Sequence, residues 1–276
     1  MISESHRLDQ KWLAPKEAWE ALFVAPAGLD IADLRRRITT ALHGITTDVN
    51  IVPGEIGTRR KKLLVADMDS TIINQECIDE IADVAGIKPK IAAITERAMR
   101  GELKFEDALN ERLALLVGLT EKQLADVYET RITLMPGATT LVATMRKYGA
   151  YAALVSGGFT FFTSKVRAKV GFDIDHSNML GMNDGRMTGR VEGPILGREA
   201  KLAYLQKYMK ERGLTEVQTM AIGDGANDLA MIKAAGLGVA FRAKPIVAAE
   251  ARASITHGDL TALLFLQGYR KDELVG

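Results

Sequence analysis

The sequence predicts an α/β protein whose mostly parallel sheet is covered by helices on both faces. Short apolar runs without polar alternation recur along the chain, and such runs are typical of strands buried on both sides. From residue 136 onward these runs alternate with amphipathic segments of helical length, which is the order of elements in parallel sheets. The 276 residues, 47% of them hydrophobic, are enough for one large domain with additions.

The composition argues against several classes of function. The 36 basic and 35 acidic residues leave a net charge of +1, which does not favour a surface for nucleic acids or membranes. No apolar run approaches the roughly 18 residues that span a membrane, and the N-terminus lacks the apolar stretch of a signal peptide. Cys77 is the only cysteine, so no intrachain disulfide can form. We expect a cytoplasmic monomer or homodimer that binds neither nucleic acid nor membranes.

Residues 1–58 predict a small β-α-β unit ahead of the main domain. Asp30 is a suitable helix N-cap and Gly44 is a natural helix stop. A unit of this size buries little apolar surface alone, so we expect it to pack on the main domain or on a partner chain. Its expected segments are a loose polar start (1–13), a strand (18–26), a helix (30–44) and a second strand (46–54).

The stretch from Leu63 to Glu76, LLVADMDSTIINQE, combines a buried strand with acidic side chains. Its first four residues are apolar, and Asp67 and Asp69 follow closely. In open α/β sheets, ligands bind outside the carboxyl ends of the strands. The two acids suit a divalent metal site, or a nucleophile paired with a general acid/base. They equally suit the cap of a following helix.

Residues 74–135 predict a helical insertion. Apolar residues recur at helical spacing throughout it, and Thr120 with Gln123 forms a capping-box pattern. Arg112 lies seven residues after Phe105 and therefore falls on the apolar face of one predicted helix. Such an arginine either extends its side chain to water or uses its planar guanidinium to capture a carboxylate or phosphate.

The remainder of the chain alternates between strands and helices. Apolar runs predict strands, apolar residues spaced three or four apart predict helices, and an Asn-Asp-Gly turn between two short runs predicts a hairpin. In order, the expected segments are a helix (137–149), a strand (150–158), a helix (159–171), a short strand (172–180), a hairpin (182–191), a helix (197–213), a strand (219–225), a helix (226–236), a strand (237–241) and two helices (244–252 and 258–269).

Three of the predicted strands end in polar side chains, and a parallel sheet brings such ends to one edge. They are Asp67 and Asp69, then Ser156-Gly157-Gly158, then GDGAND at 223–228. The aspartates, Asp224 among them, supply oxygen ligands for a hard cation such as Mg²⁺. Ser-Gly-Gly offers a hydroxyl and accessible amides to phosphate oxygens, although alone it equally suits a plain turn. The convergence of all three favours a site for a phosphate ester.

The motifs together resemble a known family. DMDST (67–71), SGG (156–158) and GDGANDL (223–229), with a lysine between the last two, resemble the haloacid dehalogenase (HAD) superfamily of aspartate-nucleophile phosphatases. VADMDSTIINQE, FEDALNERLALL and VSGGF are closely similar to the phosphoserine phosphatase family, and the resemblance covers about residues 60 to 270. It implies a HAD-like Rossmannoid core formed by two segments, with a helical cap inserted between them: the core is 59–73 and 136–276, and the cap is 74–135.

The resemblance also implies roles for individual residues, with Mg²⁺ as the cofactor and a small molecule as the binding partner. The implied chemical residues are Asp67 as nucleophile and metal ligand, Asp69 as general acid/base and as metal ligand through its backbone carbonyl, Asp224 as third metal ligand, and Asp228 as metal support. The implied substrate residues are Glu76 and Arg112 for the ammonium and carboxylate groups, Ser156 and Lys201 for the phosphoryl group, Gly157 and Asn227 to complete the site, and Met99 and Phe105 to line it.

The implied activity is hydrolysis of O-phosphoserine to serine and phosphate through an aspartyl phosphate, the last step of serine biosynthesis. Two alternatives remain open: a phosphotransferase that passes the phosphoryl group to another hydroxyl, and a catalytically silent scaffold that binds a metal or a partner. Relatives often carry N-terminal regulatory ACT domains of β-α-β-β-α-β order. Only about half of such a unit fits before Arg59, so we do not expect control by free serine through an intact ACT domain.

Overall fold

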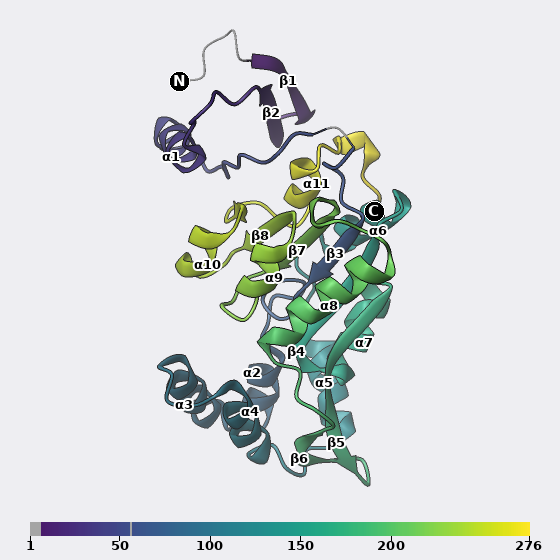
Figure 1. Cartoon of the computed structure of the whole chain (residues 1–276). Helices are drawn as coiled ribbons and strands as arrows, with labels where there is room; N and C mark the ends of the chain where they lie inside the picture. The colour runs from purple at the N-terminus through teal and green to yellow at the C-terminus, as the bar shows by residue number, and fades with distance from the viewer. Residues whose placement is uncertain (1–6, 56) are drawn as a thin grey trace.

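The computed structural model describes residues 7–55 and 57–276, and a seven-stranded sheet forms its centre (Figure 1). The strand order is β6-β5-β4-β3-β7-β8-β9. β6 runs antiparallel to β5, and all other neighbours are parallel, so the predicted mostly parallel sheet is confirmed. The strands are β3 (Leu63–Ala66), β4 (Tyr151–Phe159), β5 (Ile174–Asn183), β6 (Arg186–Glu192), β7 (Thr219–Gly223), β8 (Leu237–Phe241) and β9 (Ala253–Ile255).

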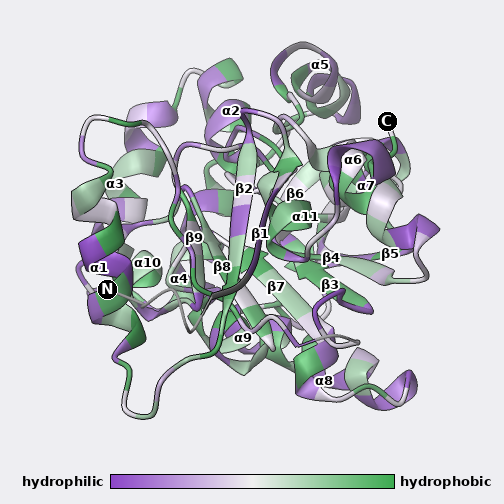
Figure 2. Ribbon diagram, turned by 90° about the horizontal axis from the view of Figure 1, so that it is seen from above, coloured by the Kyte–Doolittle hydropathy of each residue, from purple (hydrophilic) through white to green (hydrophobic). Residues whose placement is uncertain are grey.

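Helices cover both faces of the sheet because successive strand residues point into two different apolar cores. Leu64 of β3 packs in one core with α6, α7 and α11, whereas Leu63 packs in the other with α8 and α9. Figure 2 shows the apolar strands enclosed by helices with mixed hydropathy. The helices are α6 (Ala138–Lys147), α7 (Thr160–Val170), α8 (Arg198–Glu211), α9 (Leu229–Ala234), α10 (Pro245–Glu250) and α11 (Ala262–Leu266).

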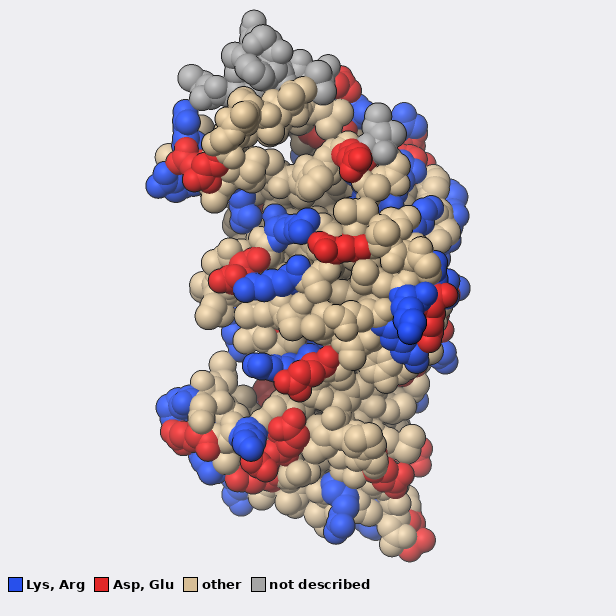
Figure 3. Space-filling view, in the orientation of Figure 1, with Lys and Arg blue, Asp and Glu red and all other residues tan. Residues whose placement is uncertain are grey.

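The surface of the molecule carries charges of both signs. On the face drawn in Figure 3, basic and acidic side chains are interspersed and no large patch has a single sign, as the near-zero net charge predicts. Within the described ranges, none of the helices combines the length and the apolar character that a membrane crossing requires.

The insertion after β3 is helical, as predicted, and the first of its helices lie at the lower left of Figure 1. The Thr120–Gln123 capping box is present at the start of its last helix. The chain leaves and re-enters the core side by side, because Ile73 bridges Leu134 and the Met135 N–H donates to the Ile72 carbonyl (2.8 Å). The helices are α2 (Cys77–Val84), α3 (Lys88–Met99), α4 (Phe105–Ala114) and α5 (Glu121–Arg131).

A second attachment joins the insertion to the core through the predicted β5–β6 hairpin. The Met187 N–H donates to the Leu119 carbonyl (2.8 Å), and the Gly118 N–H donates to the Met187 carbonyl (2.9 Å). These strand-like bonds connect β6 to the loop between α4 and α5. The insertion is therefore joined to the core at these two places, and Phe105 at the start of α4 also lies close to Gly157 and Gly197 of the core.

The predicted N-terminal β-α-β unit is wrong in its order of elements. The described residues form an antiparallel hairpin of β1 (Arg7–Ala14) and β2 (Ala18–Phe23), followed by α1 (Ile31–Ala41). The described part of the start that we expected to be loose (7–13) is a strand, with Trp12 opposite Trp19 in the hairpin, and the rest of that start (1–6) lies outside the described residues. The helix and its Asp30 cap are confirmed, since the Asp30 carboxylate accepts from the Asp33 N–H (3.0 Å).

The expected strand at 46–54 is absent because its polar side chains, rather than its backbone, pair with the sheet. Asn50 donates through Nδ2 to the Ser254 carbonyl (3.0 Å) and accepts from the Ser254 N–H (2.8 Å). Asp48 accepts from the N–H groups of Thr256 and Gly258 (2.8 Å each). Ser254 lies in β9, a three-residue strand that the sequence did not predict, and the other two partners follow directly after it.

Candidate active site

The ends of β4, β3 and β7 lie side by side, because these parallel strands are neighbours in the sheet. Asp67 follows β3, Ser156 and the two glycines after it lie in the last part of β4, and Asp224 follows β7. The predicted convergence of the three motifs at one edge is therefore present. β3 and β7 are buried along their whole length, and the aspartates follow directly after them.

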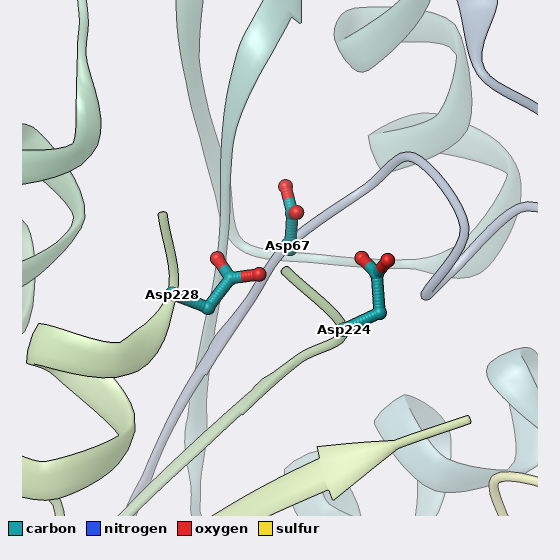
Figure 4. Close-up of side chains that lie close together, drawn as sticks. All are labelled: Asp67, Asp224 and Asp228. Carbon is teal, nitrogen blue, oxygen red and sulfur yellow. The ribbon is translucent and has the colours of Figure 1, made fainter. Parts of the chain in front are cut away.

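Three carboxylates gather at this edge in a way that suits a metal ion. One oxygen each from Asp67, Asp224 and Asp228 lies within 4.8 Å of the others, and Figure 4 shows their side chains around a common space. Hard oxygen ligands of this kind fit Mg²⁺. The carboxylate of Asp69 is not in this cluster, and the ligand expected from Asp69 is its backbone carbonyl.

Lys201 joins two members of the acidic cluster. Its ammonium lies 2.7 Å from Asp67 Oδ1 and 2.6 Å from Asp228 Oδ1, and its side chain is 1% exposed. Burial opposes the charged form of Lys201, but the two carboxylates outweigh burial and raise the pKa of Lys201. One ammonium balances only one of the three carboxylates, and this excess of negative charge also favours a bound divalent cation.

Burial and a neighbouring negative charge raise the pKa values of Asp67 and Asp224. Burial, followed by the charge of Asp228, raises the pKa of Asp67 well above its ordinary value. The same two causes raise the pKa of Asp224 to about 6. Thr71, which the sequence analysis did not assign, is buried and donates through its hydroxyl to Asp224 Oδ1 (3.5 Å).

Asp69 is held apart from the acidic cluster by two hydrogen bonds. Its Oδ1 accepts from the Cys77 N–H (3.0 Å), and its Oδ2 accepts from the Ser156 hydroxyl (3.2 Å). Burial raises the pKa of Asp69. A carboxyl group that is fixed in place, has a raised pKa and stands beside the acidic cluster can carry a proton to and from a bound group.

Two glycines are required by the close packing around these acids. A Cβ atom at Gly158 would lie 2.9 Å from Asp69 Oδ2, and a Cβ atom at Gly223 would collide with the Asp228 carboxyl group. The Gly158 N–H donates to Ser156 Oγ (2.9 Å). The glycines therefore allow backbone amides and carboxylates to approach the same small volume.

Glu76 and Arg112 approach the site from the insertion. Glu76 is exposed and accepts a hydrogen bond from the Ser70 hydroxyl (2.7 Å). Desolvation of its carboxyl by the surrounding protein, followed by the charge of Asp69, raises the pKa of Glu76 to about 7. Arg112 is half-buried, and its partners among the described residues are neutral oxygens, the Ala108 carbonyl (3.1 Å) and the Thr95 hydroxyl (3.5 Å).

The remaining predicted substrate residues lie at different depths. The Phe105 ring reaches Gly157, since a Cβ atom there would be 3.4 Å from Phe105 Cζ. Met99 is 65% exposed at the end of α3, and Asn227 is exposed in the β7–α9 loop. The structure brings Phe105 to the site edge, whereas the assignment of Met99 and Asn227 stays a prediction.

Comparisons with known proteins agree with this geometry. The family of haloacid dehalogenase-like hydrolases matches residues 64–233. Phosphoserine phosphatase of Streptomyces coelicolor is 39% identical over 99% of this chain and 67% of the relative, and that of Polaromonas sp. is 45% identical over 79% of this chain and 94% of the relative.

Solved structures extend the likeness to the fold. A probable phosphoserine phosphatase from Vibrio cholerae has a TM-score of 0.78 and 35% identity, covering 92% of this chain and 78% of that one. A substrate-bound phosphoserine phosphatase has a TM-score of 0.69 and 41% identity, covering 74% of this chain and 97% of that one. The chain therefore belongs to the haloacid dehalogenase-like hydrolases and, among them, to the phosphoserine phosphatases.

Proposed function

We propose that this enzyme hydrolyses O-phosphoserine to serine and phosphate through a phosphorylated Asp67, as the last step of serine biosynthesis. The observation that carries the proposal is the placement of Asp67 among Lys201, Asp224 and Asp228, with the proton carrier Asp69 two residues away. A solved relative with 41% identity is described as a phospho-aspartyl intermediate analogue of phosphoserine phosphatase, which supports this chemistry.

In the first half of the reaction, a carboxylate oxygen of Asp67 attacks phosphorus and the bond from phosphorus to the serine oxygen breaks. Asp69 gives its proton to that oxygen as serine leaves. In the second half, Asp69 takes a proton from water while the water oxygen attacks phosphorus. The bond between phosphorus and Asp67 then breaks, which returns both carboxyl groups to their initial states.

The phosphoryl oxygens need fixed positive and hydrogen-bonding groups throughout. Lys201, the Gly157 N–H and the Ser156 hydroxyl supply them, and the Ser156 proton turns from Asp69 Oδ2 to a phosphoryl oxygen when the substrate binds. Mg²⁺, held by Asp67, Asp224 and the Asp69 carbonyl and supported by Asp228, would neutralise phosphoryl charge. Uncatalysed hydrolysis of phosphate monoesters is so slow that enzymes accelerate it by up to about 10²¹-fold, so a nucleophile alone is insufficient.

Substrate choice rests on the opposite charges that the insertion presents. Glu76 suits an ammonium group, and Arg112, which has no carboxylate partner among the described residues, suits a carboxylate. We propose that residues 74–135 act as a cap whose closure places Phe105 against Gly157 and excludes bulk water. The solved relative described as substrate-bound supports a small-molecule substrate for this pocket.

The direct test is phosphate release from a panel of phosphomonoesters, with Mg²⁺ and with a chelator. Phosphoserine is expected to be the best substrate, and chelation is expected to stop turnover. A phosphotransferase would instead yield a phosphorylated hydroxyl acceptor in excess of free phosphate. Turnover that is unaffected by the chelator would contradict the proposed metal dependence.

A further inference from the structure

Asn178, in the middle of β5, is a buried side chain with all of its polar atoms engaged. It is 2% exposed. Its Nδ2 donates to the Gly157 carbonyl (2.9 Å), and its Oδ1 accepts from the Leu196 N–H (2.7 Å). A longer contact joins Nδ2 to the Leu196 carbonyl (3.5 Å). One amide thus connects the phosphate-binding end of β4 to the loop that precedes α8.

The bond to Gly157 fixes more than one carbonyl. The Gly157 carbonyl and the Gly158 N–H belong to the same planar peptide group, so orienting one orients the other. The Gly158 N–H donates to Ser156 Oγ (2.9 Å). Asn178 therefore determines the direction from which Ser156 Oγ receives a hydrogen bond.

The Ser156 hydroxyl then has a defined role as a donor. Because Oγ accepts from Gly158, its own proton is free to be given to Asp69 Oδ2, which lies 3.2 Å away. A continuous set of hydrogen bonds leads from Asn178 through the 157–158 peptide and Ser156 to Asp69. At the other end of this set, Asn178 Oδ1 accepts from the Leu196 N–H. Leu196 precedes Gly197, the N-cap of α8, and α8 carries Lys201.

We propose that Asn178 is a positioning residue for phosphoryl transfer, which orients the Gly157–Gly158 peptide and, through it, the Ser156 hydroxyl. The inference rests on the proposed function and adds a residue to it. The role needs a donor and an acceptor on one short planar side chain. Aspartate keeps the size and the acceptor for Leu196 but has no donor for Gly157, and alanine lacks both.

Steady-state kinetics on phosphoserine with Asn178→Asp and Asn178→Ala tests the proposal. Misplacement of catalytic groups by about 1 Å costs on the order of 100-fold, so we expect kcat to fall by about this factor in both variants. KM is expected to change much less, because the peptide and hydroxyl matter most as charge develops on the phosphoryl group.

Ser177→Ala is the matched control, because Ser177 is the neighbouring residue of β5. Its hydroxyl bonds Thr163 (2.8 Å) and Thr160 (3.1 Å), and neither partner is assigned to the site. Loss of these bonds is expected to lower the free energy of unfolding without lowering kcat. Urea unfolding of all variants separates a stability effect from the loss of positioning.

Each outcome bears on the proposal. An Asn178→Asp enzyme with the parent kcat would overturn it, since that variant loses the Nδ2 bonds to the Gly157 and Leu196 carbonyls while it keeps the acceptor for the Leu196 N–H. If neither Asn178 variant folds, the residue is structural and the proposal is wrong. A parent enzyme that does not turn over phosphoserine would overturn the proposed function itself. When the parent is fully active, the kcat values of the variants test the role of Asn178 alone.

Discussion

The charge balance of the site depends on one side chain, Lys201. Its ammonium is fully buried between Asp67 and Asp228, although in the sequence it is one of several lysines on an amphipathic helix. Only the family resemblance singled it out. Asn178 carried no signal at all, because a polar residue within a short strand has no motif, and only its contacts reveal its place.

Lys201→Met is expected to destabilise the protein by about 3–5 kcal/mol near neutral pH, because it leaves buried carboxylates without their partner. Burial and Asp228 already raise the pKa of Asp67, and removing the ammonium raises it further. The folded variant then binds more protons than the unfolded chain, so its stability falls as pH rises above the ordinary carboxyl pKa. Urea unfolding at pH 5 and pH 8 measures this dependence.

Lys207→Met is the control for that measurement, since Lys207 lies on the same helix with its side chain 49% exposed. We expect a change within about 0.5 kcal/mol, as for most surface substitutions. Equal losses of stability in the two variants, or no dependence on pH for Lys201→Met, would contradict the buried charge balance described for the site.

Titration of Glu76 is expected to change the binding of the substrate with pH rather than the rate of the chemical step. Its pKa of about 7 means that its carboxyl is largely neutral below that pH in the free enzyme. A neutral carboxyl attracts an ammonium group weakly, so the KM for phosphoserine is expected to rise as pH falls below 7. Glu76→Gln is expected to have a high KM that varies less with pH.

The phosphate ester of 3-hydroxypropanoate is the control substrate, because it lacks only the ammonium group. Titration of the substrate phosphate and of Asp224, whose pKa is about 6, affects both esters alike. The additional rise in KM should therefore appear with phosphoserine alone. The same pH profile for both substrates would rule out Glu76 as the ammonium site.

At the scale of elements, the sequence predicted the parts of the fold that have strong local signals. Apolar runs located β3, β4, β7 and β8, and the Asn-Asp-Gly turn located the β5–β6 hairpin. β9 was missed because three residues are too few to show a pattern. The attachment of β6 to the α4–α5 loop could not be predicted either, because backbone hydrogen bonds between distant segments produce no local sequence pattern.

Gly189 of β6 lies against the end of α4 and the loop after it, so a substitution there tests the attachment of the insertion to the core. It has a φ of +81°, and an added Cβ atom would collide with Val117 and lie 3.2 Å from the Leu113 carbonyl. Gly189→Ala is therefore expected to lower the free energy of unfolding by more than the roughly 1–2 kcal/mol typical of a left-handed backbone alone. The control is Gly185→Ala, where φ is +71° and nothing lies within 4 Å. Equal losses in urea unfolding would show that the β6–cap contact is not tight.

At the scale of the whole molecule, a linker with polar side chains connects the N-terminal unit to the core. The sequence suggested a strand at 46–54 because Val49, Ile51 and Val52 are good strand formers. Long-range bonds from Asp48 and Asn50 to the end of the sheet prevail over that local preference. Only tertiary contacts can reveal such an arrangement, which explains why the predicted order of elements was wrong.

Asp48→Ala is expected to loosen the N-terminal unit, because it removes the acceptor of backbone N–H groups at residues 256–258. Limited proteolysis should then cut the 42–58 linker faster than in the parent. Asp30→Ala, which removes the α1 cap within the same unit, is expected to cost about 1 kcal/mol without exposing the linker. Equal rates of linker cleavage in Asp48→Ala and the parent would show that this contact does not hold the unit.

The proposed catalysis depends on a covalent bond between Asp67 and phosphorus. The most direct measurement is acid quenching of the enzyme during turnover of ³²P-labelled phosphoserine, followed by identification of the labelled peptide. We predict label on the peptide that contains Asp67 in the parent, and neither label nor turnover in Asp67→Asn. Full turnover by Asp67→Asn, or label on a different residue, would contradict the mechanism.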